Sequence, residues 1–108
     1  MKTYEVRHAG LLSGFEISSW IGRWRACRIV RAIPGTRIVR WPRRWAKSED
    51  EFCEFELDGE RFLIIEPFGD SSRFWIVSDP PAPEIAIENV RGFFARARAI
   101  DWRWGKGG

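Results

Sequence analysis

The Asp58-Gly59 pair constrains the fold more than any other feature of this 108-residue sequence. It lies between EFCEFEL and ERFLII, two runs rich in aromatic and branched side chains. Asp-Gly favours a two-residue type I′ turn, because both central positions of that turn need positive φ. We therefore predict an antiparallel β-hairpin. Its expected pairs are Leu57 with Glu60, Glu56 with Arg61, Phe55 with Phe62, and Cys53 with Ile64.

This register sorts the hairpin side chains onto two faces. The face expected to be core carries Cys53, Phe55, Leu57, Phe62 and Ile64. The face expected to be half solvated carries Glu54, Glu56 and Arg61, mixed with Phe52, Leu63 and Ile65.

The C-terminal part predicts a third strand and a helix. RFWIVS at 73–78 resumes the strand pattern after the turn-forming PFGDSS. The prolines of DPPAP end that strand, but Pro83 suits the first turn of a helix. From Glu84 to about Ile100 apolar residues recur at spacings of three and four, which indicates an amphipathic helix.

The N-terminal half is expected to form strands. TYEVRH and SGFEISSW fit two of them, although Ser18 or Ser19 could instead cap a helix that starts at Trp20. A helix over 20–33 is disfavoured, because it would place Arg31 on the face shared by the first tryptophans. We therefore predict a hairpin between 28–32 and 37–41, in which Val30 pairs with Val39.

These elements predict one α+β domain, since a chain of this length has room for a single core. The expected architecture is an antiparallel, meander-like sheet of about four to six strands with a C-terminal helix on one face. The chain divides into a basic half (1–47), an acidic β-meander (48–79), the helix (83–100) and a flexible tail (105–108).

Charge is strongly segregated along the chain. Basic side chains exceed acidic ones by nine in residues 1–47 and by four in residues 91–108, whereas acidic side chains exceed basic ones by ten in residues 48–90. Most of the cations are arginine, whose planar fork of donors suits carboxylate and phosphate. This layout favours recognition of a charged partner.

Catalysis and cofactor binding are poorly supported. His8 is the single histidine and has no serine or cysteine motif near it, and two distant cysteines cannot supply a clustered metal site. We expect no enzyme activity, metal or cofactor. Cys27 and Cys53 could pair, but the expectation is two reduced, buried thiols, because the chain has no export signal. The chain has neither a membrane-length apolar segment nor an export signal, so a cytoplasmic location is expected.

The leading functional hypothesis is non-enzymatic protein binding. It assumes that large aromatic side chains fill the core, with Trp20, Trp24, Trp75 and Trp102 among them, so that surface charge remains for recognition. A bacterial toxin-neutralising protein of the immunity or antitoxin kind fits this layout, with a cationic toxin or nuclease domain as its partner. The expected contact residues are Glu49, Asp50, Glu51, Glu54, Glu56, Asp58 and Glu60.

The alternative hypothesis is binding of single-stranded nucleic acid, whose bases stack on aromatic side chains within a cationic groove. The residues with suitable chemistry are Arg40, Trp41, Arg43, Arg44 and Trp45. The neighbouring acidic segment counts against this hypothesis, because it repels phosphate at short range. Exposed stacking of Trp24, Trp41 and Trp45 beside arginines would reverse the preference.

Overall fold

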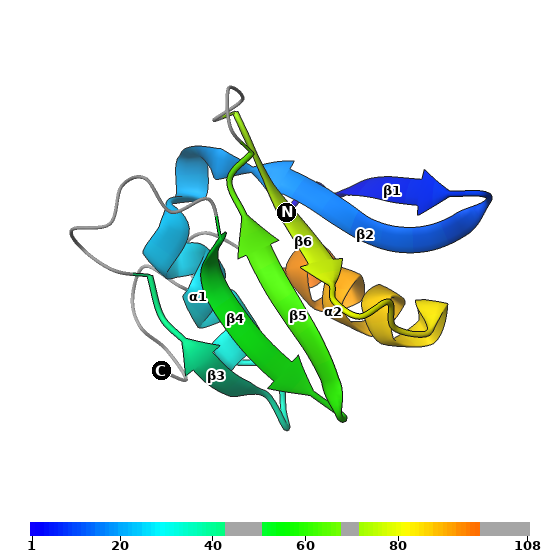
Figure 1. The fold of residues 1–108 in the computed structure, drawn as a ribbon. Helices are drawn as coiled ribbons and strands as arrows, with labels where there is room; N and C mark the ends of the chain where they lie inside the picture. The colour runs from blue at the N-terminus through cyan, green and yellow to red at the C-terminus, as the bar shows by residue number, and fades with distance from the viewer. Residues whose placement is uncertain (43–50, 68–71, 98–108) are drawn as a thin grey trace.

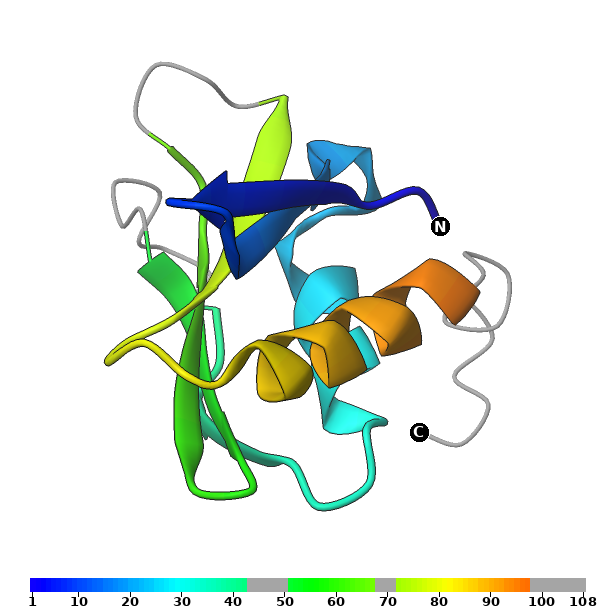
Figure 2. The ribbon, with the colours of Figure 1, turned by 90° about the vertical axis from the view of Figure 1, so that its right-hand side faces the viewer.

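Six antiparallel strands form one sheet in a computed structural model of the chain, which describes residues 1–42, 51–67 and 72–97. The strand order is β1-β2-β6-β5-β4-β3. The elements are β1 (Tyr4–His8), β2 (Leu11–Ser18), the 3₁₀ turn η1 (Ser19–Ile21), α1 (Arg23–Arg31), β3 (Arg37–Arg40), β4 (Glu51–Leu57), β5 (Glu60–Ile65), β6 (Arg73–Ser78) and α2 (Glu84–Arg96). Both helices lie on the same side of the sheet (Figures 1 and 2). This confirms the α+β class and the C-terminal helix that packs on the sheet.

The β4–β5 hairpin has the predicted register. Each of the four expected pairs is present, and both Asp58 and Gly59 have positive φ, at 54° and 79°. The five side chains assigned to the core face are all buried. Phe52 and Leu63, expected to be half solvated, are buried as well. A bulge between Glu51 and Cys53 breaks the alternation that placed Phe52 outside, and Leu63 lies on a central strand beside Val77.

Among the residues that the structure describes, phenylalanine and not tryptophan fills the core. The largest fully buried side chains are Phe15, Phe52, Phe55, Phe62 and Phe94. The expectation that tryptophans serve as core filler is wrong for Trp20, Trp24 and Trp75, which are 70%, 45% and 40% exposed. Trp75 follows Phe74 on β6, and successive strand residues point to opposite faces, so it faces away from the helices. Trp102 lies outside the described residues.

The predicted hairpin between 28–32 and 37–41 is wrong, because residues 23–31 form α1 and β3 pairs with β4 instead. The buried side chains of α1 are Ala26, Cys27, Ile29 and Val30, which share one side of a helix. The error came from assigning Trp24 to the core. Once Trp24 lies outside that face, the remaining apolar residues agree with a helix.

Helix α2 begins as predicted but ends earlier, at Arg96, where the sequence analysis extended it to Ile100. Ala97 is already extended, with ψ at 143°. The N-terminal ammonium of Met1 donates to the carbonyl oxygens of Phe94, Ala95 and Ala97, at 3.2, 2.8 and 2.7 Å. A cation at this position satisfies the free carbonyls and complements the negative end of the helix dipole.

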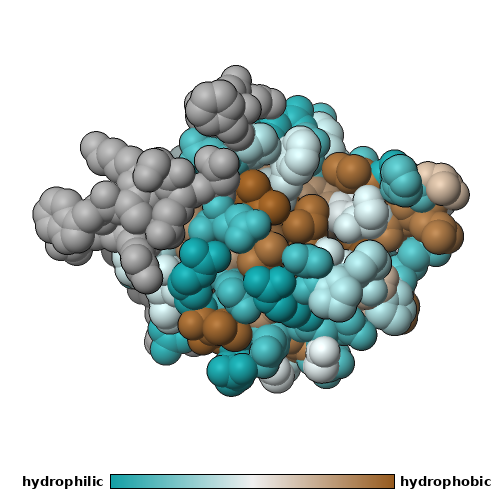
Figure 3. Space-filling view, viewed as in Figure 1, coloured by the Kyte–Doolittle hydropathy of each residue, from teal (hydrophilic) through white to brown (hydrophobic). Residues whose placement is uncertain are grey.

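The sheet face that points away from the helices carries both polar and apolar side chains (Figure 3). Cross-strand ion pairs lie among them, such as Arg61 with Glu54 and Arg73 with Glu16. No helix of the described residues is long and apolar enough to span a membrane.

Candidate functional site

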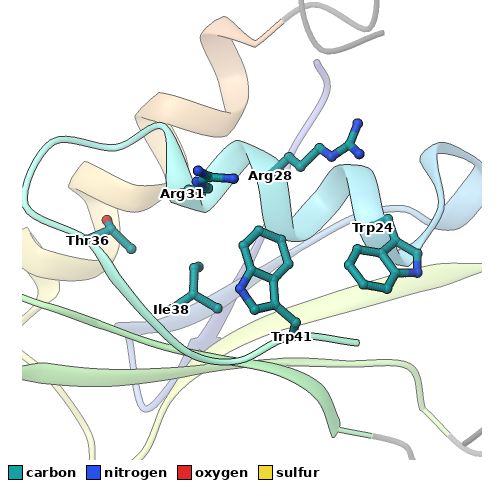
Figure 4. A pocket seen from close by; sticks show the side chains of 6 residues that line it. All are labelled: Trp24, Arg28, Arg31, Thr36, Ile38 and Trp41. Carbon is teal, nitrogen blue, oxygen red and sulfur yellow. The ribbon is translucent and has the colours of Figure 1, made fainter. Parts of the chain in front are cut away.

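An aromatic and cationic hollow lies between α1 and the segment that follows β3. Trp24, Arg28 and Arg31 are spaced four and three residues apart on α1, so they project from the same side of the helix. Trp41 follows β3 directly and faces them (Figure 4). The four side chains therefore come together only because residues 23–31 are helical.

The two indoles of this hollow form a stacked pair. The ring centroids of Trp24 and Trp41 are 5.8 Å apart, with an interplanar angle of 21°. The guanidinium of Arg31 lies 5.8 Å from the centroid of the Trp41 ring, within cation–π range. Trp41 is partly buried against the core, whereas Trp24 is almost half exposed. The pair is thus anchored at one end and open to solvent at the other.

The hollow has a volume of about 690 Å³, within the range of small-ligand sites. Its lining residues are Trp24, Arg28, Arg31, Thr36, Ile38 and Trp41. The hydroxyl oxygen of Thr36 is buried and has no hydrogen-bond partner within the described residues. The site therefore combines two aromatic faces, two cations and one apolar side chain.

The arginines of this hollow differ from three others, of which Arg23 begins α1 while Arg37 and Arg61 lie on the sheet. Arg23, Arg37 and Arg61 form ion pairs with glutamates at 2.9, 2.5 and 2.9 Å. Within the described residues, neither Arg28 nor Arg31 has a carboxylate within ion-pair distance, and both side chains are exposed. Their charge is therefore available to an anionic ligand.

The acidic residues predicted as the partner site are partly neutralised. Glu54 and Glu56 are paired with Arg61 and Arg37, and Glu51 lies 3.9 Å from Arg40. The hydrogen bond from Arg61 is the main cause that lowers the pKa of Glu54, against the opposing effect of desolvation. These pairs reduce the negative charge that this strand presents.

Two further acidic residues of that set lie at the β4–β5 turn. Asp58 is exposed and Glu60 is half-buried, and neither forms an ion pair within the described residues. Glu49 and Asp50 lie outside the described residues. The acidic set is therefore split between paired residues on β4 and unpaired ones at the turn.

Of the residues proposed for nucleic-acid binding, the structure places Trp41 in the hollow and Arg40 at the adjacent edge strand. Arg43, Arg44 and Trp45 lie outside the described residues. Arg28 and Arg31 were not among the predicted site residues, because their segment was expected to be a strand and is a helix. Their spacing from Trp24 was the signal that could have found them.

The structure does not bring His8 together with either cysteine. His8 ends the edge strand β1 and is exposed, whereas both cysteines are buried near β4, on the far side of the strand order. Within residues 1–42, 51–67 and 72–97, no group of three or more side chains is arranged to hold a metal ion. Comparison with protein-family models, with curated proteins and with solved structures found no match for this chain. Its function must therefore be argued from these side chains.

Proposed function

We propose that this protein binds single-stranded nucleic acid through the hollow formed by Trp24, Arg28, Arg31 and Trp41. The observation that carries the proposal is the solvent-open stack of Trp24 on Trp41 beside two arginines that have no carboxylate partner in the described chain. This alternative hypothesis from the sequence becomes the preferred function, because one of the two arguments against it, a core filled by tryptophan, is wrong for Trp24.

Base stacking supplies the aromatic half of the interaction. Stacking of a base on an aromatic side chain contributes about 1–3 kcal/mol and tolerates any sequence, because every base has a π-face. The indole of Trp24 is 45% exposed, so a large part of an aromatic surface meets water in the free protein. Trp41 stacks on the Trp24 indole, which reduces the entropy that the Trp24 side chain loses when a base binds.

Phosphate contacts supply the cationic half. The guanidinium of Arg28 and that of Arg31 lie one helical turn apart on the side of α1 that lines the hollow. Arginine meets phosphate oxygens with two parallel donors. A strand whose base stacks on Trp24 would bring its backbone phosphates to these donors.

The acidic β4 strand opposes this binding less than the sequence suggests. Glu54 and Glu56 each form an ion pair with an arginine of a neighbouring strand. Paired charges produce a weaker field at the distance of the hollow than isolated carboxylates do. The proposal also includes the cytoplasmic location expected from the sequence, where single-stranded RNA and DNA occur.

The test is the affinity of the protein for a fluorescein-labelled oligodeoxythymidylate, measured by fluorescence anisotropy at low salt. Trp24→Ala should weaken binding about 5- to 150-fold, the equivalent of one lost stacking contact. Trp20→Ala is the matched control, because Trp20 is even more exposed and does not line the hollow. Equal affinity of the two variants, or no binding by the wild type, would overturn the proposal.

Protein binding through the acidic turn is a second proposal, with a toxin-neutralising role as its specific form. It is supported by Asp58 and Glu60, whose carboxylates have no ion pair in the described chain. Complementary charge mainly raises association rates. Asp58→Asn with Glu60→Gln should then slow capture of a cationic protein partner, whereas Trp24→Ala should leave it unchanged. Unchanged capture by the double variant would contradict this second proposal.

A further inference from the structure

Cys27 and Cys53 are two buried thiols that contact each other between α1 and β4. Their Sγ atoms are 2.6 Å apart, both side chains are fully buried, and both are unbonded thiols. Cys27 belongs to the buried side of the helix, and Cys53 follows the bulge in the strand. We infer that this pair is a cross-linking site, where oxidation ties α1 covalently to the sheet.

The fold already supplies the arrangement that such a bond requires. A disulfide forms only where two cysteines point toward each other from backbones a few ångströms apart. Here each sulfur already meets the other, and helix α1 packs against β4. The disulfide-bonded fold can therefore keep both elements in their present places. Both cysteines are free thiols, as expected from the sequence, and their contact makes them a pair.

The oxidant is a low-molecular-weight disulfide such as oxidised glutathione. One cysteine thiolate attacks it, releases one glutathione thiol and forms a mixed disulfide. The second cysteine then displaces the other glutathione thiol and leaves the protein disulfide. Two protein S–H bonds become one S–S bond and two protons move to the leaving thiols, so the oxidant takes up both electrons.

Burial controls when this exchange occurs. The hydrogen bond with Cys27, followed by desolvation, raises the pKa of Cys53, so the Cys53 thiolate is scarce in the closed fold, and burial keeps a dissolved oxidant away from both sulfur atoms. Exchange must therefore proceed while the chain folds or when α1 lifts from the sheet. The same helix carries Trp24 and Arg28, but the inference does not depend on what binds there.

The test compares the thiol–disulfide equilibrium of the wild-type chain in native buffer and in concentrated urea. The reduced chain is equilibrated with mixtures of reduced and oxidised glutathione, then trapped with N-ethylmaleimide and weighed by mass spectrometry. The protein disulfide takes up no maleimide, whereas the dithiol takes up two. At equal glutathione ratios, the proportion of protein disulfide to dithiol should be about 100-fold higher in native buffer than in urea. The disulfide stabilises the folded chain, so folding must favour the disulfide by the same free energy.

Cys27→Ser and Cys53→Ser provide the controls, since neither can form the internal bond and each should give only thiol or mixed disulfide. A protein disulfide-to-dithiol ratio in native buffer that equals or falls below that in urea would overturn the inference. The comparison uses the wild-type chain alone, so it stands even if a serine variant folds poorly. It also needs no oligonucleotide, so its failure is distinct from failure of the proposed function.

Discussion

The salt dependence of oligonucleotide binding should report the two arginines of the hollow directly. Each phosphate neutralised on a single strand contributes about 0.7 to the slope of log Kd against log salt. If Arg28 and Arg31 meet one phosphate each, together they contribute about 1.4 to the slope. Raising the salt from about 50 to about 200 mM should then weaken their part of the binding roughly sevenfold.

Arg28→Ala should remove half of that contribution. For this variant, the slope of log Kd against log salt should fall by about 0.7. The loss of affinity that the hollow contributes between low and high salt should shrink from roughly sevenfold to about threefold. The assay is anisotropy of a labelled oligodeoxythymidylate at several sodium chloride concentrations. The slope is more informative than a single affinity, because unfolding of a variant lowers the active fraction without changing the slope.

Arg25→Ala is the matched control for this measurement. Arg25 lies on the same helix and has no ion pair within the described residues, but it does not line the hollow. Its substitution should leave the slope near the wild-type value. A wild-type slope for Arg28→Ala, or an equally lowered slope for Arg25→Ala, would show that Arg28 does not contact phosphate in the hollow.

Three further predictions concern the fold. Phe94→Ala, which empties a fully buried site, should lower the free energy of unfolding in urea by about 3–5 kcal/mol. Trp20→Ala should change it by about 0.5 kcal/mol or less, because Trp20 is exposed. Similar losses for the two variants would contradict a phenylalanine core. Gly92→Ala should stabilise α2 by about 0.5–1 kcal/mol, because a Cβ there meets only the end of the flexible Arg96 side chain. A lower melting temperature of the variant would show that the site is more crowded. Because Arg61 lowers the pKa of Glu54, the pair contributes stability above the usual carboxyl pKa of 4.5, and this contribution is lost as the pH falls below it. Glu54→Gln should therefore be less stable than wild type at neutral pH and converge with it in acid, and a constant difference from pH 3 to pH 7 would argue against the pair.

Local chemistry explains which elements the sequence could predict. The β4–β5 register follows from the Asp58-Gly59 turn, because the turn geometry fixes every pair beyond it. The start of α2 follows from Pro83 and from the apolar spacing after it. Its early end does not, because the capping group is the Met1 ammonium, which comes from the opposite end of the chain.

The candidate site was harder to predict, because it depends on how two types of aromatic residue share the core. Volume alone favours tryptophan inside, but five phenylalanines already fill the space between the sheet and the helices. Because phenylalanine occupies the core, Trp24 lies at the surface. The other apolar residues from Arg23 to Arg31 then fit one buried side of a helix. Charge segregation along the chain was also misleading, since strand pairing places Arg37 beside Glu56.

Binding of single-stranded nucleic acid in the hollow can be observed through the indole N–H signals in ¹⁵N-edited NMR spectra during titration with an oligonucleotide. Tryptophan-to-phenylalanine variants assign each signal. The account predicts that the signals of Trp24 and Trp41 shift on titration while those of Trp20 and Trp75 stay in place. Binding that moves only the signals of Trp20 or Trp75, or that leaves Trp24 and Trp41 unchanged, would contradict it.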